Sequence, residues 1–230
     1  MSQAKKSYRF LFIGNSYTYY NELWDRVAEV AALCGIEATV DHVTKGGAKL
    51  SLMLDPESEY GQAVEQKLTT ERYDTVILQD NSLRTIAEPE GFFADIPSLH
   101  AKIEANGAKT LLYQTWARRA GSSKFATYNL TVESMTQVIG AAYRKAAAEI
   151  GADVSPVGDA FYDIVCNHPE IDLYNADGTH PSPAGTALAA LCMVGKIFNR
   201  SVADIVYPFG TENEEQAKLL ALAANKAIGA

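Results

Sequence analysis

Residues 10–24, FLFIGNSYTYYNELW, decide the fold of this chain. An apolar run stops at Gly14, and an Asn-Ser pair precedes a segment whose apolar residues lie three or four positions apart. This pattern predicts a buried strand that leads through a glycine turn into a helix. Ser16, at that turn, is either the N-cap of the helix or a nucleophile.

The same alternation of short apolar runs and longer segments with helical spacing recurs along the chain. It predicts an α/β fold in which helices cover both faces of a five-stranded parallel sheet, a three-layer α/β/α arrangement. The predicted strands are residues 8–14, 37–43, 74–79, 109–115 and 153–158. The predicted helices are residues 21–33, 61–68, 98–105, 132–150, 183–198 and 212–228.

The chain of 230 residues contains no internal repeat, low-complexity segment or Pro/Ser-rich linker. We therefore expect a single domain over residues 1–230, with its core at about 8–200 and a helical C-terminal extension at 201–230. The apolar residues of the last helix cover either this domain or a second subunit, so a homo-oligomer stays an alternative.

The charge pattern argues against two classes of partner. The chain has 20 basic and 28 acidic residues, a net charge of −8, and no stripe of Lys and Arg that could follow a phosphate backbone. The uncharged stretch at residues 181–195 contains Gly and Pro and is too short to span a bilayer. We expect neither a nucleic acid nor a membrane as a partner.

The cysteines and the N-terminus bear on the compartment. Cys34, Cys166 and Cys192 are odd in number and lie in the apolar or small-residue contexts that are typical of buried thiols, which indicates a reducing compartment. Residues 1–16 contain a short apolar run but no small-residue cleavage site, so no signal peptide is expected. These features predict a cytoplasmic protein.

Polar and small residues follow each predicted strand. In open parallel sheets, ligands bind beyond the carboxyl ends of the strands. Those ends lead to Ser16, to Gly47, to the stretch LQDNS at residues 78–82, to TWAR at residues 115–118, and to DGTHPS at residues 177–182. We expect these segments to meet at one edge of the sheet.

Together these segments contain the groups that nucleophilic catalysis needs. A serine nucleophile requires a base, a histidine base requires a carboxylate that orients its ring, and an acyl-transfer intermediate requires donors for its oxyanion. Ser16 and His180 supply the nucleophile and base, and Asp177 is close enough in sequence to reach the His180 ring. Considered alone, Ser16 is interpreted as a helix cap, and His180 is interpreted as a solvated loop residue. Their combination favours catalysis.

The blocks FIGNSYT, KGGAKL, LQDNS and DGTHPS resemble, in order and spacing over residues 9–200, those of the SGNH (GDSL-like) hydrolases. TWAR, together with GNSYT and DGTHPS, is also similar to a bacterial subgroup with suspected carbohydrate-esterase members. The resemblance implies a flavodoxin-like fold and a Ser16, His180 and Asp177 triad that attacks an ester. It also implies an oxyanion hole built from the N–H groups of Ser16 and Gly47 and the side chain of Asn81.

The chain departs from the family pattern at two places. Asn15 stands where the family usually has Asp before the serine, a variation expected to be harmless. In the third block, Gln79-Asp80-Asn81 replaces a Gly-x-Asn pattern. Either Asn81 or Gln79 is therefore the side-chain donor to the oxyanion, and the position in the loop favours Asn81.

No motif predicts a metal or a cofactor. Cys166 and His168 lack two further ligands at recognisable spacing, and GGAK at residues 46–49 lacks the pattern of a phosphate loop. His42, His100 and His168 are therefore interpreted as structural.

Aromatic residues cluster near the serine and after the fourth strand. Tyr17, Tyr19 and Trp116 are expected at the rim, where aromatic faces suit a sugar or a small polar ester. Tyr20 and Trp24, four positions apart, are expected in the core of the first helix.

We therefore expect a serine esterase that acts on a small-molecule or carbohydrate ester and removes a short acyl group, above all acetyl, through an acyl-enzyme. One alternative is a non-catalytic flavodoxin-like module that binds a sugar or an anion. The other is an acyltransferase that uses the same triad.

Overall fold

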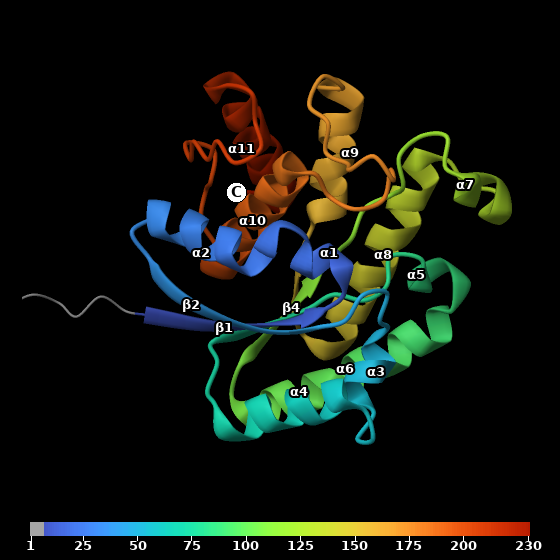
Figure 1. Ribbon diagram of the computed structural model, residues 1–230, viewed down its shortest axis with the longest axis vertical. Helices are drawn as coiled ribbons and strands as arrows, with labels where there is room; N and C mark the ends of the chain where they lie inside the picture. Colours follow the sequence, from blue (N-terminus) through green and yellow to red (C-terminus); the bar gives the residue numbers. More distant parts are fainter. Residues whose placement is uncertain (1–6) are drawn as a thin grey trace, which may run out of the picture.

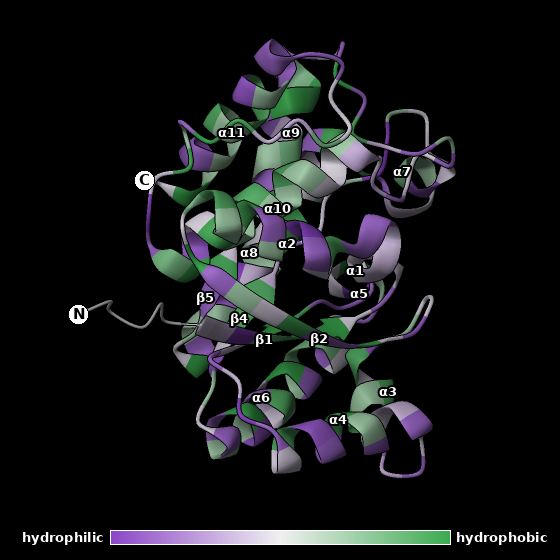
Figure 2. Ribbon diagram, turned by 60° about the vertical axis from the view of Figure 1, so that its left-hand side comes forward, coloured by the Kyte–Doolittle hydropathy of each residue, from purple (hydrophilic) through white to green (hydrophobic). Residues whose placement is uncertain are grey.

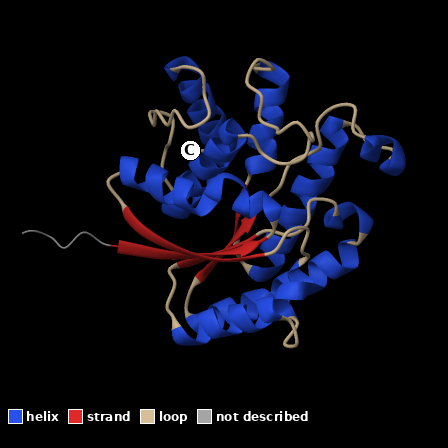
Figure 3. Ribbon diagram, viewed as in Figure 1, coloured by secondary structure: helices blue, strands red, loops and turns tan. Residues whose placement is uncertain are grey.

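The computed structural model describes residues 7–230, which form a five-stranded parallel sheet with the strand order β2-β1-β3-β4-β5 (Figure 3). The strands are β1 (Ser7–Gly14), β2 (Glu37–Thr44), β3 (Thr75–Leu78), β4 (Lys109–Tyr113) and β5 (Asp153–Ser155). Ile13 of β1 pairs with Val43 of β2 and Leu78 of β3, so these three strands end nearly level. The predicted α/β fold with a five-stranded parallel sheet is confirmed.

Helices cover both faces of this sheet, as Figure 1 shows. They are α1 (Ser16–Tyr19), the 3-10 turn η1 (Tyr20–Glu22), α2 (Leu23–Leu33), α3 (Leu50–Leu54), α4 (Glu59–Thr70), α5 (Arg84–Ala87), α6 (Pro89–Asn106), α7 (Ser123–Tyr128), α8 (Val132–Ile150), α9 (Val157–Asn167), α10 (Pro183–Phe198) and α11 (Glu214–Ile228).

The alternation of side chains along β1 creates two hydrophobic cores. Phe10 and Phe12 belong to a core with α2, α9, α10 and α11. Leu11 and Ile13 belong to the other core, with α3, α4, α6 and α8. All four side chains are fully buried. Because successive strand residues point to opposite faces, an unbroken apolar strand must have helices on both sides, which gives the three layers.

Helix α10 is the most deeply buried helix in the layer above the sheet, and Figure 2 colours most of it green. Ser182 caps its first turn by accepting a hydrogen bond from the Gly185 N–H, and Pro183 occupies the first helical position. This start fixes the chain directly after His180. The bounds predicted for α8 and α10 are confirmed because both helices have clear capping residues in the sequence.

Other element bounds differ from the prediction. The fifth strand ends at Ser155 rather than residue 158, and the unpredicted helix α9 begins directly after Pro156. Helix α2 begins at Leu23 rather than residue 21, because Asn21 and Glu22 have φ of 54° and 52°. Helix α6 starts nine residues earlier than predicted and contains Pro97. The short helices α1, α3, α5 and α7 were also not predicted.

The C-terminal helix packs on the same chain. Leu220, Ala221 and Ala224 are fully buried in the core that also contains α10. Figure 1 shows α11 beside α10 at the far side from the sheet. Helix α11 therefore covers the core of its own chain.

The cysteines differ in exposure. Cys192 is buried and Cys34 is partly buried, but Cys166 is exposed on α9, so the expectation of a buried thiol is wrong there. Within residues 7–230, no helix is long and apolar enough to cross a bilayer. The expectation that the chain lacks a signal peptide rests partly on residues 1–6, which lie outside the described residues.

Candidate active site

The site lies where the strand order reverses. The chain leaves β1 for β2 on one side and then returns to β3 on the other side of β1. The loops after β1, β2 and β3 therefore meet at the carboxyl ends of the strands, where α/β proteins bind ligands.

Asn15, not Ser16, caps the first helix. The Asn15 Oδ1 accepts a hydrogen bond from the Tyr17 N–H at 3.1 Å, and Ser16 is the first helical residue. The turn is tight, because a side chain at Gly14 would place a Cβ 2.4 Å from the Thr18 Oγ1. The Ser16 hydroxyl is thus not used for capping.

Ser16, His180 and Asp177 form a continuous chain of hydrogen bonds. The Ser16 Oγ lies 2.8 Å from the His180 Nε2, and the His180 Nδ1 lies 2.5 Å from the Asp177 Oδ2. An ionised carboxylate only accepts, so Nδ1 carries the proton and Nε2 accepts from the serine hydroxyl. The structure therefore brings the three predicted residues together in the order that proton transfer from serine requires.

The carboxylate of Asp177 also organises its own loop. Its Oδ1 accepts hydrogen bonds from the N–H groups of Thr179 and His180, both at 2.9 Å. Burial raises the pKa of Asp177, but the hydrogen bonds from His180 and Thr179 outweigh this effect and lower the pKa below its ordinary value. Asp177 is therefore ionised when His180 takes up a proton.

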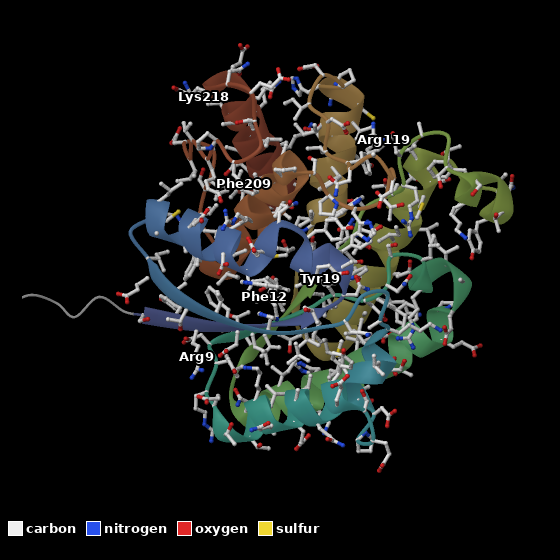
Figure 4. All side chains as sticks on the ribbon, in the orientation of Figure 1. Arg9, Phe12, Tyr19, Arg119, Phe209 and Lys218 are labelled. Atoms are coloured by element: carbon white, nitrogen blue, oxygen red, sulfur yellow. The ribbon has the colours of Figure 1, made fainter. Side chains whose placement is uncertain are left out.

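The TWAR segment and the arginine after it hold the histidine loop from behind. The Trp116 Nε1 donates to the Thr179 carbonyl at 3.1 Å, and the Arg119 N–H donates to the Gly178 carbonyl at 2.9 Å. The Arg119 guanidinium, labelled in Figure 4, binds the Asp172 carboxylate at 2.7 and 2.8 Å. Sequence reasoning missed this role; the proximity of TWAR to the site was its only signal.

Tyr20 stacks on the catalytic histidine. Their ring centroids lie 4.2 Å apart with an interplanar angle of 9°. The neighbouring Asn21 donates from its Nδ2 to the Thr186 Oγ1 at 2.8 Å and to the Pro181 carbonyl at 3.2 Å. The expectation that Tyr20 lies in the helix core is wrong, because the left-handed residues Asn21 and Glu22 separate it from α2. Trp24 is only partly buried and stacks on another histidine, His42, at 3.8 Å.

The candidate oxyanion donors come from three loops. Gly47 has φ of 69°, a conformation that favours glycine, and its carbonyl lies 3.5 Å from the Asn81 Nδ2. The Asn15 Nδ2 donates to the Ala48 carbonyl at 2.9 Å and so ties the Gly47 turn to the serine turn. Within residues 7–230, the Ser16 and Gly47 N–H groups form no hydrogen bond.

Gln79 has a different environment from Asn81. It is buried, and its Oε1 accepts hydrogen bonds from the Asn15 N–H at 2.9 Å and the Thr18 hydroxyl at 2.8 Å. Its Nε2 donates to the Asp80 carbonyl. Gln79 therefore supports the serine turn, and the Asn81 amide is the less constrained donor.

A buried ion pair fixes the Asn81 loop. Asp80 is fully buried, and its Oδ1 accepts from the N–H groups of Asn81 at 2.7 Å and Leu50 at 3.0 Å. Its Oδ2 binds Arg84 at 2.9 Å, and Arg84 also binds Asp95 at 2.6 Å. Sequence reasoning did not identify this network, because its partners come from separate helices.

The predicted aromatic rim is wrong for two of its three residues. Tyr17 is 4% exposed and Trp116 is 0% exposed, stacked on Phe161 at 4.0 Å. The Trp116 indole donates to the Thr179 carbonyl of the histidine loop, and the Tyr17 ring lies 4.6 Å from the Trp116 ring. Tyr19, labelled in Figure 4, is 37% exposed, and its hydroxyl lies beside Gly46. It is the one predicted rim residue that reaches solvent.

The remaining histidines contact structural neighbours. The His100 Nδ1 lies 2.9 Å from the Thr110 Oγ1, and His168 lies beside Glu170. Within residues 7–230, no group of three or more His, Cys, Asp or Glu side chains could hold a metal ion. A hollow of about 190 Å³ is lined by residues that include Arg118, Arg119, Asp172 and Tyr174 but neither Ser16 nor His180. The hydrogen-bonded serine, rather than this hollow, marks the candidate site.

Solved structures share this fold. A protein from Slackia heliotrinireducens, classed provisionally as an SGNH hydrolase, has 32% sequence identity, and the match covers 84% of this chain and all of that chain, with a TM-score of 0.73. A DUF4886 family protein from Bacteroides uniformis has 21% identity over 97% of this chain and 95% of its own, with a TM-score of 0.83. An acetylxylan esterase from Geobacillus stearothermophilus has 16% identity over 84% of this chain and 96% of its own, with a TM-score of 0.55.

The fold and the 32% identity to the Slackia protein place the chain in the class of α/β hydrolytic enzymes. The similarity to the Slackia protein extends over most of both chains, and the chain belongs to the SGNH (GDSL-like) hydrolase superfamily. The matches at 21% and 16% identity show the fold alone. No family model matches the sequence, and no curated protein does.

Proposed function

We propose that the protein is a serine esterase that removes short acyl groups, acetyl above all, from a small or carbohydrate substrate. The observation that carries this proposal is the hydrogen-bonded series of Ser16, His180 and Asp177, with 2.8 Å between Oγ and Nε2 and 2.5 Å between Nδ1 and Oδ2. A serine in contact with a carboxylate-oriented imidazole is poised to act as a nucleophile.

In the first half-reaction, His180 Nε2 accepts the Ser16 hydroxyl proton while Oγ bonds to the ester carbonyl carbon. The resulting oxyanion receives hydrogen bonds from the N–H groups of Ser16 and Gly47 and from the Asn81 amide. The His180 cation, stabilised by Asp177, then gives its proton to the departing alcohol oxygen as the carbon–oxygen bond breaks. An acyl-enzyme on Ser16 remains.

In the second half-reaction, water replaces the alcohol. His180 accepts a proton from the water as its oxygen attacks the acyl carbon, and then returns that proton to the Ser16 oxygen as the acyl bond breaks. The products are a carboxylic acid and the free enzyme. A sugar hydroxyl in place of water would give acyl transfer by the same steps.

The preference for acetyl draws on two features. Ser16 is only 7% exposed and its flanking residue Tyr17 is buried, so the space at the nucleophile favours a small acyl group. Among the proteins of similar fold are acetylxylan esterases, which supports a carbohydrate ester as substrate. Tyr19 offers an exposed aromatic face beside the Gly46 turn for a sugar ring.

Two measurements test this proposal. A fluorophosphonate probe should modify Ser16, located by peptide mass spectrometry, and should leave Ser16→Ala unlabelled. A panel of esters from acetate to octanoate, with acetylated sugars included, should show the highest kcat/KM for acetyl. Absence of both labelling and turnover would contradict an esterase and favour a non-catalytic binding module, whereas formation of acylated alcohol at the expense of free acid would indicate an acyltransferase.

A further inference from the structure

Arg118 lies between the two loops that carry the proposed reaction groups. Its guanidinium donates to the Ser82 Oγ at 3.0 Å, and Ser82 directly follows Asn81. Its Cζ lies 6.0 Å from the ring centroid of Tyr17, which directly follows Ser16. The Tyr17 ring in turn lies 5.8 Å from the His180 ring. Arg118 is therefore a positive charge close to the reacting groups.

The charge of Arg118 has no carboxylate partner within residues 7–230, unlike its neighbours at the site. Arg119 binds Asp172, and Arg84 binds Asp80 and Asp95. Arg118 is partly buried, and its Nε, like those of Arg84 and Arg119, is fully buried without a hydrogen-bond partner. A guanidinium that has lost part of its hydration without gaining a counter-charge is unfavourable unless an anion binds to it.

The environment of Tyr17 points to the same place. Its hydroxyl is buried and lies near the side chain of Ser82, which also binds Arg118, without meeting the geometry of a hydrogen bond. Burial raises the pKa of Tyr17, and the nearby charge of Arg118 opposes that rise. A buried hydroxyl without a well-formed hydrogen bond and a partly buried cation without a carboxylate thus both lie next to the nucleophile segment.

We propose that Arg118 binds a carboxylate of the substrate, so that the natural substrates are esters of acidic compounds such as acylated uronic acids. This inference rests on the proposed esterase function and names its substrate class. Arginine suits this role because its planar donors match the geometry of a carboxylate and because it keeps its charge at every physiological pH.

The test compares substrates that differ only in charge. One pair is acetylated galacturonic acid and the same sugar with its carboxylate converted to a carboxamide. The other pair carries the charge on the acyl side: the 4-nitrophenyl esters of succinic acid and of its half amide. Wild-type enzyme should prefer the acid in at least one pair by roughly tenfold or more in kcat/KM, mainly through a lower KM, as expected for one additional ion pair.

Two variants separate binding from loop support. Arg118→Gln should reduce the ratio of kcat/KM for the acid to kcat/KM for the amide to about one. The variant lowers kcat/KM far more for the acid than for the amide. Ser82→Ala, which removes the hydrogen-bond partner of Arg118 but keeps the charge, should retain the preference. Equal kcat/KM for acid and amide in both wild-type pairs, or an equal loss on acid and amide in Arg118→Gln, would overturn the inference.

A binding measurement keeps this inference distinct from the esterase proposal. Ser16→Ala should bind galacturonate more tightly than galacturonamide in calorimetry, and the double variant with Arg118→Gln should bind both alike. If Ser16→Ala binds galacturonate and galacturonamide with equal affinity, the role of Arg118 is refuted, even if the wild-type enzyme hydrolyses neutral esters. If Ser16→Ala binds galacturonate more tightly but the wild-type enzyme shows neither turnover nor probe labelling, the esterase proposal is refuted and the carboxylate site is retained.

Discussion

Asp177 has a lowered pKa because the hydrogen bonds from His180 and Thr179 outweigh the effect of burial. A carboxyl whose pKa is lower in the folded state stabilises the fold at neutral pH, and this contribution is lost only as the pH falls through the lowered pKa. Asp177 is therefore still ionised at the pH where a histidine base becomes protonated. The acid side of the activity profile should therefore not report the titration of Asp177.

The first prediction concerns Asp177→Asn. Removal of the charge destabilises the His180 cation, so the acid limb of kcat/KM should move to lower pH. The value of kcat should fall by up to about 10⁴-fold, because Asn no longer fixes the proton on Nδ1. The loss should be smaller than in Ser16→Ala, since Tyr20 still orients the ring. A pH–rate profile of the purified variant tests this; an acid limb at its wild-type position would contradict it.

The second prediction distinguishes Asn81 from Gln79. Asn81→Ala should lower kcat by about a hundredfold or more and leave KM within a few fold, because the donor acts on the oxyanion of the transition state. Gln79→Ala should instead lower stability by about 1–3 kcal/mol, because it leaves the buried Asn15 N–H and Thr18 hydroxyl without their acceptor. Both variants are assayed on one acetyl ester, with thermal melts. A folded Gln79→Ala that loses kcat while Asn81→Ala keeps it would assign the donor to Gln79.

The sequence reveals the reacting residues better than the residues that hold them. Ser16, Asp177 and His180 lie in short sequence blocks whose order and spacing are typical of a serine hydrolase. These three residues are therefore predictable from the sequence. Arg119 and Trp116 act on a loop some 60 positions away in the chain, and their contacts arise only from tertiary packing. The residue type of Trp116 alone suggested a position at the rim, which its burial contradicts.

At the scale of elements, the 3-10 turn η1 separates α1 from α2 and sets the position of Tyr20. Asn21 and Glu22 adopt left-handed backbone conformations, which cost free energy for residues other than glycine. The hydrogen bonds of Asn21 to Thr186 and to the Pro181 carbonyl compensate for this cost. The turn therefore connects α10 to the aromatic ring that covers His180.

The third prediction tests that connection. Tyr20→Ala should lower kcat by about tenfold and shift the pH–rate profile, because the imidazole loses the aromatic face that orients it and stabilises its cation. Tyr20→Phe keeps the ring and should restore both. If Tyr20→Phe is as impaired as Tyr20→Ala, the hydroxyl rather than the stacked ring is the important group.

Element boundaries were predictable where capping residues stand in the sequence. Ser182 and Pro183 mark the start of α10, and Gly151, with φ of 64°, ends α8. The fifth strand has only three residues, and the chain enters α9 directly after Pro156. A short apolar run of this kind does not distinguish a strand from the first turn of a buried helix, so α9 was missed.

At the scale of the whole molecule, the uninterrupted apolar character of β1 and β3 predicted a sheet covered on both sides, and the two separate cores agree with it. The position of α11 was not predictable in the same way. Its apolar residues fit either the domain or a second subunit, and only the packing of Leu220 and Ala224 against the α10 core decides that it covers its own chain.

The fourth prediction uses two leucines of α11. Leu220 is fully buried and Leu222 is 53% exposed. Leu220→Ala should lower the free energy of unfolding by about 2–5 kcal/mol, because it leaves a cavity against α10. Leu222→Ala should change it by less than about 0.5 kcal/mol. Denaturant unfolding of both variants checks this, and equal stabilities would mean that α11 does not contribute to the core in solution.

The central claim is that Ser16 is a nucleophile and not a helix cap, and the most direct test is the turnover of Ser16→Ala beside wild-type enzyme on the best acetyl ester. Because Asn15 supplies the cap, the variant should keep the wild-type thermal melt. Its kcat should fall by at least roughly a thousandfold, since only binding and the oxyanion donors remain. A folded Ser16→Ala that hydrolyses the ester at close to the wild-type rate would contradict the mechanism.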